Sequence, residues 1–509
     1  MKKEDFDVVI IGAGMGGLIT GAILAKRSRM KVLVVEKESQ IGGRVMSFGG
    51  PHGDFSKEEY TKLLGGASGC WVVDADPGID KIIEDGLFRN HIVDCGWHGM
   101  SAGDRCRYAV MARSLGNKRL HVSPQVGFLY YRDGGWIELK DLARGWSKGS
   151  HNERSRIAFE RQLMGMEEAK EFYDVDVREF LKSKTDDPLV QEYYETMAKF
   201  QFGINDLTRI SAGEWIMCNN MTSQTGRDLS TGGGMGDVSG GFKMVANVFA
   251  EILLENGGEI RTSNQVKEVI IKDHQVKSVV VENEKGESEQ IEVKRLVSSI
   301  PLNRIFPLIP EEHFPDEMVK TIKNIYPMPG LLGHIKLKGK IEHEWDKAMF
   351  VLNELPGIEL RGGRPVYGFE QTSVIDPSRI LRDDDGVYLQ SWVGVSASDP
   401  DEVHDLPLMK ELWKKMMDFM RQHYPDFDNM VEWAFCVAAG ALYGINPGPG
   451  MVGDHRPAVK NPLINNMFFT GDTVTQFDVG SSGAAHGAVH CANAVSGQDH
   501  LVLLPSYMR

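Results

Sequence analysis

Residues Asp7 to Arg44 read DVVIIGAGMGGLITGAILAKRSRMKVLVVEKESQIGGR, and this stretch decides the fold of the chain. It opens with an apolar run, Val8 to Ile11, that is short enough for a buried parallel strand. Gly12, Gly14 and Gly17 follow with the spacing G-x-G-x-x-G. In such a turn the first glycine permits a tight bend and the second lets backbone approach a pyrophosphate. The third lets the following helix pack closely on the sheet.

The residues behind this turn complete a nucleotide-binding unit. A helix from about Gly17 to Arg27 would direct its positive N-terminal end at phosphates. A second apolar run, Val32 to Val35, ends at Glu36, which lies 24 residues after Gly12. That is near the spacing at which an acidic side chain accepts hydrogen bonds from an adenosine ribose. The unit predicts a bound dinucleotide, and the alternative is a structural glycine turn in an unrelated α/β unit.

The same stretch could be taken for a signal peptide or a membrane span, because Val8 to Ala25 carries no charge. Five glycines inside it, and the acids Glu4, Asp5 and Asp7 just before it, argue against both. We find no cleavable leader and no other apolar stretch of about 20 residues. The sequence therefore predicts a cytoplasmic protein, and peripheral contact with a membrane stays open.

The length, net charge and cysteine content of the chain argue against several classes of protein. A chain of 509 residues is too long for one ordinary core, so we expect at least two domains. Its formal charge of -14 argues against nucleic acid or an anionic membrane surface as the main partner. The six cysteines contain no C-x-x-C pair, which favours free thiols and argues against a cysteine-bound metal. No metal site is predicted.

A second motif, Gly42-Gly43-Arg44, lies directly behind Glu36. Two glycines and an arginine can bring backbone and a guanidinium to a diphosphate. With the first motif, this segment resembles the flavoprotein superfamily of amine oxidases, protoporphyrinogen oxidase and carotenoid desaturases and isomerases. The resemblance implies FAD as the cofactor. It also implies an α/β fold, in which a Rossmann-like FAD-binding domain of the glutathione-reductase/amine-oxidase type is interleaved with an α+β substrate domain.

Two later segments match the same family. Gly240-Gly241, a helix and several short strands precede Val266, whose backbone would contact the adenine by resemblance. Near the end, Gly471-Asp472 closes an apolar strand, and a glycine-rich turn and a helix follow from Gly480 to Ala488. The residues that the resemblance assigns to FAD are Gly12, Ala13, Gly14, Met15, Gly16, Gly17, Glu36, Lys37, Gly43, Arg44, Val266, Gly471, Asp472, Gly483 and Ala484.

These segments predict the domain division. Residues 1–70, 231–301 and 437–509 would form the FAD-binding domain, and residues 71–230 and 302–436 the substrate domain. The expected elements of the substrate domain are a hairpin at Phe128–Trp136, helices at Glu153–Tyr173, Pro188–Phe202 and Leu408–Tyr424, and strands at Leu331–Leu337 and Val387–Val395.

One segment and three single residues have open roles. Ile210 to Met221 could line a substrate pocket or belong to the core. Lys336 could contact the flavin through water, as a lysine does in amine oxidases, but we expect an exposed strand residue. His486 is a weak candidate for catalysis, because His titrates near neutrality and could donate or relay a proton. Tyr443 is a second weak candidate, which could belong to the pocket wall. Packing roles are the alternative for both.

FAD binding alone does not name a reaction, because the family covers C–N oxidation, C–C desaturation, saturation and isomerisation. Amine oxidases of the family carry an aromatic cage residue just before the final helix, where this chain has Gly480-Ser481-Ser482-Gly483. Ala441 to Gly450 is more similar to the carotenoid isomerase, desaturase and retinol saturase branch.

The sequence therefore predicts an FAD-dependent oxidoreductase that adds or removes hydrogen across a C–C bond of a hydrophobic, isoprenoid or alicyclic, small molecule. A quinone, oxygen or a protein carrier would accept electrons from a desaturase. Alternatives are an amine oxidase and, from another class, a prenyl-binding escort protein of the Rab-GDI type.

Overall fold

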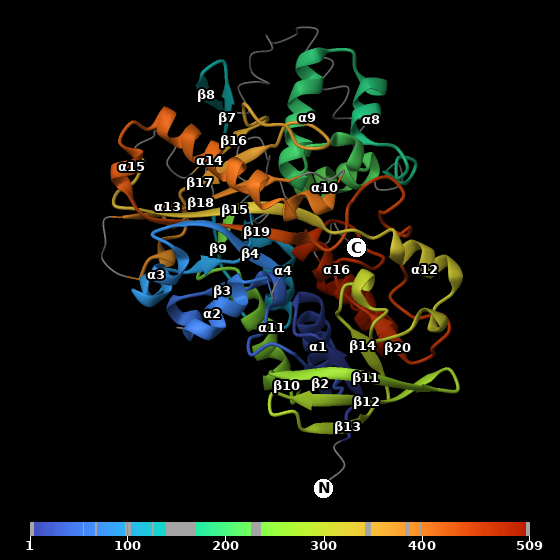
Figure 1. Cartoon of the computed structure of the whole chain (residues 1–509). Coiled ribbons are helices and arrows are strands. Elements are labelled where there is room, and N and C mark those ends of the chain that lie inside the picture. Colours follow the sequence, from blue (N-terminus) through green and yellow to red (C-terminus); the bar gives the residue numbers. More distant parts are fainter. Residues whose placement is uncertain are drawn as a thin grey trace.

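The computed structural model describes residues 5–504 except for positions 54, 67–68, 97–98, 100–102, 125–126, 139–168, 225–235, 342–347, 382–385 and 396–398. Two large sheets dominate the molecule: a five-stranded sheet in one half and an eight-stranded sheet in the other (Figure 1). The mixed α/β fold class predicted from the sequence is confirmed.

The five-stranded sheet has the order β10-β2-β1-β14-β20, and all of its neighbours run parallel. Its strands are β1 (Val8–Ile11), β2 (Val32–Val35), β10 (Glu259–Arg261), β14 (Leu296–Ser298) and β20 (Met467–Phe469). They come from the beginning, the middle and the end of the chain, so the sheet forms only when remote segments meet.

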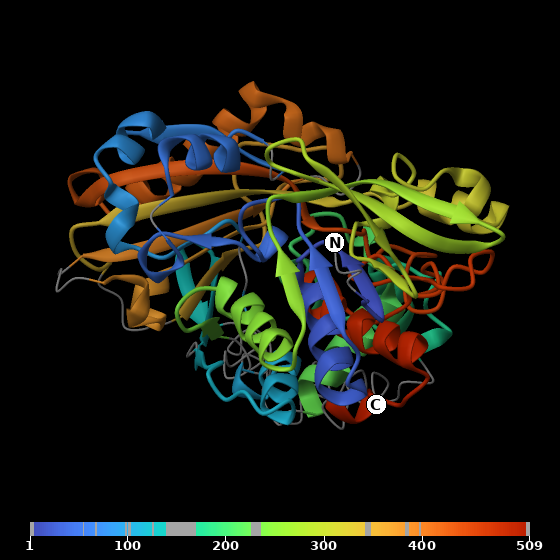
Figure 2. The same ribbon diagram turned by 90° about the horizontal axis from the view of Figure 1, so that it is seen from below.

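Both faces of this sheet are covered, which explains the unbroken apolar run of its first strand. Val8 and Ile10 belong to the core with the helices α1 (Met15–Ser28), α11 (Lys243–Glu255) and α16 (Gly480–Ser496). Val9 and Ile11 point to the other face, where they meet a small antiparallel sheet. That sheet consists of β11 (Asn264–Lys272), β12 (Gln275–Asn283) and β13 (Ser288–Glu292). Figure 2 shows helices on one side of the central strands and the small sheet on the other.

The eight-stranded sheet has the order β4-β19-β15-β18-β17-β16-β7-β8, with one parallel pair, β16 and β7. Helix α14 (Leu406–His423) packs on it through Met409, Trp413, Met416 and Met420, which share one face of the helix. The helices α8 (Val177–Lys184), α9 (Pro188–Phe202) and α10 (Ala212–Gln224) lie beside the sheet (Figure 1). The strand bounds are β4 Cys70–Asp76, β7 Gly127–Arg132, β8 Gly135–Glu138, β15 Met328–Leu337, β16 Ala348–Leu352, β17 Tyr367–Glu370, β18 Val387–Gly394 and β19 Val431–Tyr443.

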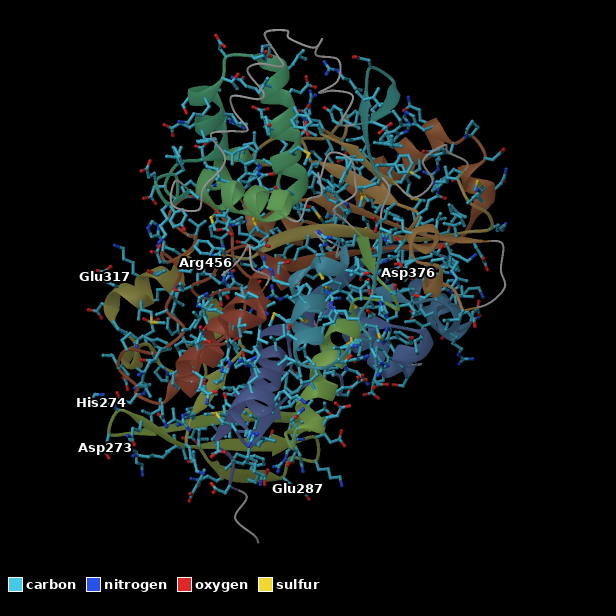
Figure 3. The ribbon with its side chains drawn as sticks, turned by 180° about the vertical axis from the view of Figure 1, so that it is seen from behind. Asp273, His274, Glu287, Glu317, Asp376 and Arg456 are labelled. Atoms are coloured by element: carbon cyan, nitrogen blue, oxygen red, sulfur yellow. The ribbon has the colours of Figure 1, made fainter. Side chains whose placement is uncertain are left out.

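Many predicted elements are confirmed. The strands β1 and β2 and the helix α9 have the predicted bounds, and the hairpin of β7 and β8 is present. Its turn residues Asp133 and Gly134 have φ values of 52° and 84°. A two-residue type I′ turn requires such positive φ values at both positions. Asp273 and His274 make the same kind of turn between β11 and β12, at the outer end of that hairpin in Figure 3.

Other predictions are wrong or need correction. Helix α1 begins at Met15 rather than at Gly17, because Gly14 already serves as its N-cap. Lys336 is fully buried rather than exposed, since all of β15 is covered on both faces. Its Nζ donates to the carbonyl of Leu337 at 2.9 Å and lies 3.6 Å from a carboxylate oxygen of Glu432.

The segment Ile210–Met221 forms most of α10, and Trp215 and Met217 lie in the core. The predicted helix Glu153–Tyr173 lies outside the described residues up to position 168. The domain boundaries proposed from the sequence stay a prediction.

All six cysteines are free thiols, as the sequence predicts. In the part of the chain that the structure describes, no helix is long and apolar enough to cross a membrane. Among the same residues, no group of His, Cys, Asp and Glu side chains could hold a metal ion.

Candidate active site

A cavity of about 630 Å³ extends between the two large sheets. Its wall includes most of the residues that the sequence assigns to FAD: Gly12, Gly14, Met15, Gly16, Glu36, Lys37, Gly43, Arg44, Val266, Gly471, Asp472 and Ala484. Ala13, Gly17 and Gly483 do not line it and lie behind that wall. The structure thus brings together residues from three remote parts of the chain, at the carboxyl ends of the parallel strands, where ligands of such sheets bind.

The glycine turn after β1 is set by close backbone contacts. Gly12 has a φ of +95°, which favours glycine. A Cβ at Gly17 would lie 2.1 Å from the carbonyl oxygen of Gly12, so helix α1 packs directly on the turn. A Cβ at Gly16 would lie 2.8 Å from backbone atoms of Gly471. The sequence did not reveal this last contact, because it joins the two ends of the chain.

Glu36 lies at the end of β2 and is buried. Its Oε2 accepts a hydrogen bond from the backbone N–H of Ala13 at 2.7 Å, and its Oε1 accepts one from the N–H of Glu38 at 2.9 Å. Burial raises the pKa of this carboxyl above its usual value, and the two backbone donors oppose that shift. Each carboxylate oxygen has a second lone pair, so Glu36 can still accept hydrogen bonds from a ligand in the cavity.

Arg44 pairs with Asp472 across the cavity wall. Its Nη2 lies 2.8 Å from Oδ1 of Asp472, and the N–H of Gly444 donates to Oδ2 of the same carboxylate at 2.7 Å. The other terminal nitrogen of Arg44, Nη1, is buried and has no hydrogen-bond partner among the described residues. A buried guanidinium N–H without an acceptor is costly, and a diphosphate oxygen would satisfy it.

Two helices begin at this cavity without acids that would compete for a phosphate. Helix α1 has the N-cap Gly14, α16 has the N-cap Val479, and neither helix has an acidic residue in its first turn. Gly480, Ser481 and Ser482 of α16 line the cavity. The positive helix ends, the orphaned guanidinium nitrogen and the Glu36 carboxylate fit the polar groups of FAD.

Beyond the predicted cofactor residues, the wall becomes mainly apolar. It is lined by Cys70, Cys95, Phe200, Gln201, Pro327, Trp392, Ala439, Ala441 and Leu442. Cys218 of α10 also lines the cavity, so Ile210–Met221 contributes mainly to the core and in one place to the pocket.

Arg107, in the helix α4 (Arg107–Ser114), is a site residue that the sequence did not reveal, because no motif surrounds it. Its Nη2 lies 2.8 Å from Oδ2 of Asp478, and Nη1 donates to the carbonyl of Ser482. Arg107 and Asp478 both line the cavity, so this wall carries one charge of each sign.

His486 is buried behind the wall and does not line the cavity. Its Nδ1 accepts from the N–H of Phe477 at 3.4 Å, and its Nε2 lies 3.1 Å from Nε2 of His490. Burial holds the pKa of His486 well below its usual value. Arg456, labelled in Figure 3, is buried nearby and donates to the carbonyl of Asp478 at 3.0 Å. The side chain of Tyr443 lies outside the described residues.

A family model matches most of the chain. The model described as flavin containing amine oxidoreductase matches residues 82–496. A second model, of an NAD(P)-binding Rossmann-like domain, matches residues 10–58, around the glycine turn.

Matches to individual proteins are either short or of low sequence identity. An all-trans-retinol 13,14-reductase from Macaca fascicularis is 50% identical over 46 residues, which are 9% of this chain and 7% of that protein. An oxidoreductase from Methanosarcina mazei has a TM-score of 0.68 and 14% identity, and the alignment covers 95% of this chain and 98% of the other. Cyclohexylamine oxidase from Brevibacterium oxydans has a TM-score of 0.60 and 14% identity, with 97% and 99% covered. At such identity, the two solved structures show a common fold.

Proposed function

Because the chain belongs to the flavin-containing amine oxidoreductase family, we propose that it adds or removes hydrogen across a C–C bond of a hydrophobic small molecule. The family makes it an FAD-dependent oxidoreductase. Bound FAD would supply the hydride chemistry, and the protein supplies placement and a dry pocket. The desaturase, saturase and isomerase forms of this reaction stay open.

One observation carries the proposal: the apolar wall of the cavity beyond the cofactor residues. Phe200, Trp392 and Leu442 lie there, together with small side chains. An ammonium group would need an unpaired carboxylate at this place. The two acids of the neighbouring wall, Asp472 and Asp478, are each paired with an arginine. The short match to a retinol reductase adds support for an isoprenoid substrate.

The residues of the chain would act by binding and orienting. Glu36 would accept hydrogen bonds from the adenosine ribose, and Arg44 would bind the diphosphate while Asp472 fixes its guanidinium. Gly480, Ser481 and Ser482 would direct backbone N–H groups at the polar edge of the flavin. The apolar wall would exclude water and hold a substrate C–H against that cofactor, since hydride exchange needs close placement.

A second candidate is an amine oxidase, which the description of the matching family favours. Against it stand Gly480, Ser481 and Ser482, since no aromatic side chain is present at these three positions. An escort protein of the Rab-GDI type would not need a redox cofactor. The cradle made by Gly16, Glu36 and Arg44 argues against that reading.

The test begins with the absorption spectrum of the purified protein, which should contain flavin bands. The bound flavin is photoreduced without oxygen and mixed separately with polyenes and enones, and its reoxidation is followed. Amines are mixed without oxygen with the oxidised flavin, and its bleaching is followed. We also follow bleaching of the oxidised flavin with saturated and partly unsaturated lipids. Reaction with alkenes or lipids but not amines supports the proposal. Bleaching by amines alone would replace it with the amine oxidase, and a colourless protein without extractable FAD would contradict both.

A further inference from the structure

One polar side chain stands out in the apolar wall. Gln201 lies in the last turn of α9, between Phe200 and Phe202, and lines the cavity. The helix ends at Gly203, whose N–H donates to the carbonyls of Lys199 and Phe200 and whose φ is +62°. Gln201 therefore stands at a sharply defined helix end, in the apolar part of the cavity wall.

The end of α9 is held rigidly. A Cβ at Gly394 would lie 2.2 Å from the carbonyl oxygen of Gly203, so strand β18 touches the helix end directly. The ring of Phe200 packs edge-on against Phe128, with centroids 4.6 Å apart. Because both contacts fix the backbone around Gln201, only its side chain can adapt to a ligand.

The side-chain amide of Gln201 contains an acceptor that is unpaired in the part of the chain that the structure describes. Its Oε1 is shielded from solvent and has no partner among the described residues. A shielded acceptor without a donor is unfavourable, because it has lost its hydrogen bonds to water and gained none from the protein. As an acceptor, Oε1 can take a hydrogen bond only from a ligand that carries a donor.

We propose that the side-chain amide of Gln201 binds a hydroxyl group of the substrate. The inference rests on the proposed function, because it places an apolar molecule in this cavity. A hydroxyl can donate to the unpaired Oε1, whereas an ether or a hydrocarbon cannot. A charged group fits less well, because Arg107 and Asp478 already neutralise each other at 2.8 Å. The substrate class is thus a hydrophobic alcohol rather than a plain hydrocarbon.

The test compares two ligands of the FAD-loaded protein, all-trans-retinol and its methyl ether. Both are apolar polyenes, and only the alcohol can donate a hydrogen bond. Dissociation constants are measured without oxygen, from the change in the flavin absorption band. We expect the wild type to bind the alcohol about fivefold more tightly, the size of one neutral hydrogen bond. In Gln201→Met the two constants should become equal, while affinity for the ether is kept.

A matched control is Gln191→Met, which is the same substitution in the same helix. Its side chain donates to the carbonyl of Thr185, away from the cavity wall, so the fivefold preference should remain. Equal binding of alcohol and ether by the wild type, or a preference that survives Gln201→Met, would overturn the inference and leave the proposed function standing. Binding of neither ligand by the FAD-loaded wild type would also overturn the inference, whereas the proposed function fails only if alkenes and lipids do not react with the flavin. If Gln201→Met does not fold, Gln201→Leu replaces it. The ratio of the two dissociation constants in the wild type then tests the inference together with that variant.

Discussion

Arg44 and Asp472 lie 428 residues apart in the chain, yet Nη2 of the arginine is 2.8 Å from Oδ1 of the aspartate. The pair joins the segment behind β2 to the segment behind β20. It leaves Nη1 of Arg44 buried without a protein partner among the described residues. The ion pair therefore holds the guanidinium in place for an acceptor that the protein itself does not provide.

The first prediction concerns this guanidinium. Arg44→Lys keeps the positive charge but removes the planar fork, so a diphosphate and Asp472 can no longer be bound together. We expect the dissociation constant for FAD to rise about 10-fold to 100-fold, as for loss of one charge-assisted hydrogen bond. Titration of the apoprotein with FAD, followed by flavin fluorescence, measures it. Arg119→Lys, at a surface pair with Glu251, is the control and should bind FAD like the wild type.

The second prediction concerns the contact between the two ends of the chain. Gly16→Ala places a Cβ 2.8 Å from backbone atoms of Gly471, and backbone cannot yield as a side chain can. We expect a loss of about 1–3 kcal/mol in stability and weaker FAD binding. Thermal unfolding with and without FAD measures both. Gly339→Ala is the control, because its Cβ would meet nothing within 4 Å. Equal behaviour of the two variants would argue against the close approach.

The third prediction concerns a buried acidic cluster. Asp94, Asp376 and Asp237 surround Arg379, whose Nη1 lies 2.7 Å from Oδ2 of Asp94. Burial raises the pKa of Asp237 to about 7, and the neighbouring carboxylates add to the shift. Asp376 marks this cluster in Figure 3, on the other side of the view from Arg456.

A raised carboxyl pKa stabilises the fold while the group is protonated. The contribution of Asp237 is complete below its ordinary pKa, near 4, and is lost as the pH rises through about 7. We expect the midpoint of thermal unfolding of the wild type to fall by about 2 °C or more between pH 5.5 and pH 8.5 relative to Asp237→Asn. Asp316→Asn, at the exposed start of a helix, should follow the wild type. Parallel curves for wild type and Asp237→Asn would contradict the prediction.

Local patterns predicted local structure well. The run Val8–Ile11 and the helix Pro188–Phe202 carry their own signals, in apolar periodicity and in the Asp187 cap before a proline. The glycine turn, Glu36 and Arg44 could be placed in one cavity because their spacing is typical of a family. The burial of Lys336 could not be predicted, since it depends on which strands flank β15 and not on its own segment.

The parts of the site that the sequence did not reveal have a common physical cause. The contact of Gly16 with Gly471, the pair of Arg107 with Asp478 and the place of Gln201 all join segments that are remote in the chain. No local periodicity or motif reports such pairs. The residues at the substrate end of the cavity could therefore be predicted from the sequence less well than the residues at its cofactor end.

The last prediction concerns His486, which the sequence offered as a weak candidate for catalysis. Its imidazole is buried behind the cavity wall, beside His490 and within the field of Arg107 and Arg456. Burial is the largest cause of its lowered pKa, and these positive neighbours act in the same direction. Since unfolded histidine gains a proton below about pH 6.5, the folded state is penalised there.

The contribution of His486 to stability is therefore present above about pH 6.5 and lost as the pH falls toward its folded pKa. We expect the midpoint of thermal unfolding to drop more in the wild type than in His486→Gln between pH 7.5 and pH 5, by about 1–3 °C. His313→Gln, outside this cluster, should behave as the wild type does. Because the ring stays neutral at neutral pH and does not reach the cavity, His486→Gln should keep bound FAD and the shape of any pH–rate profile. Loss of one limb of that profile would instead make His486 a proton donor.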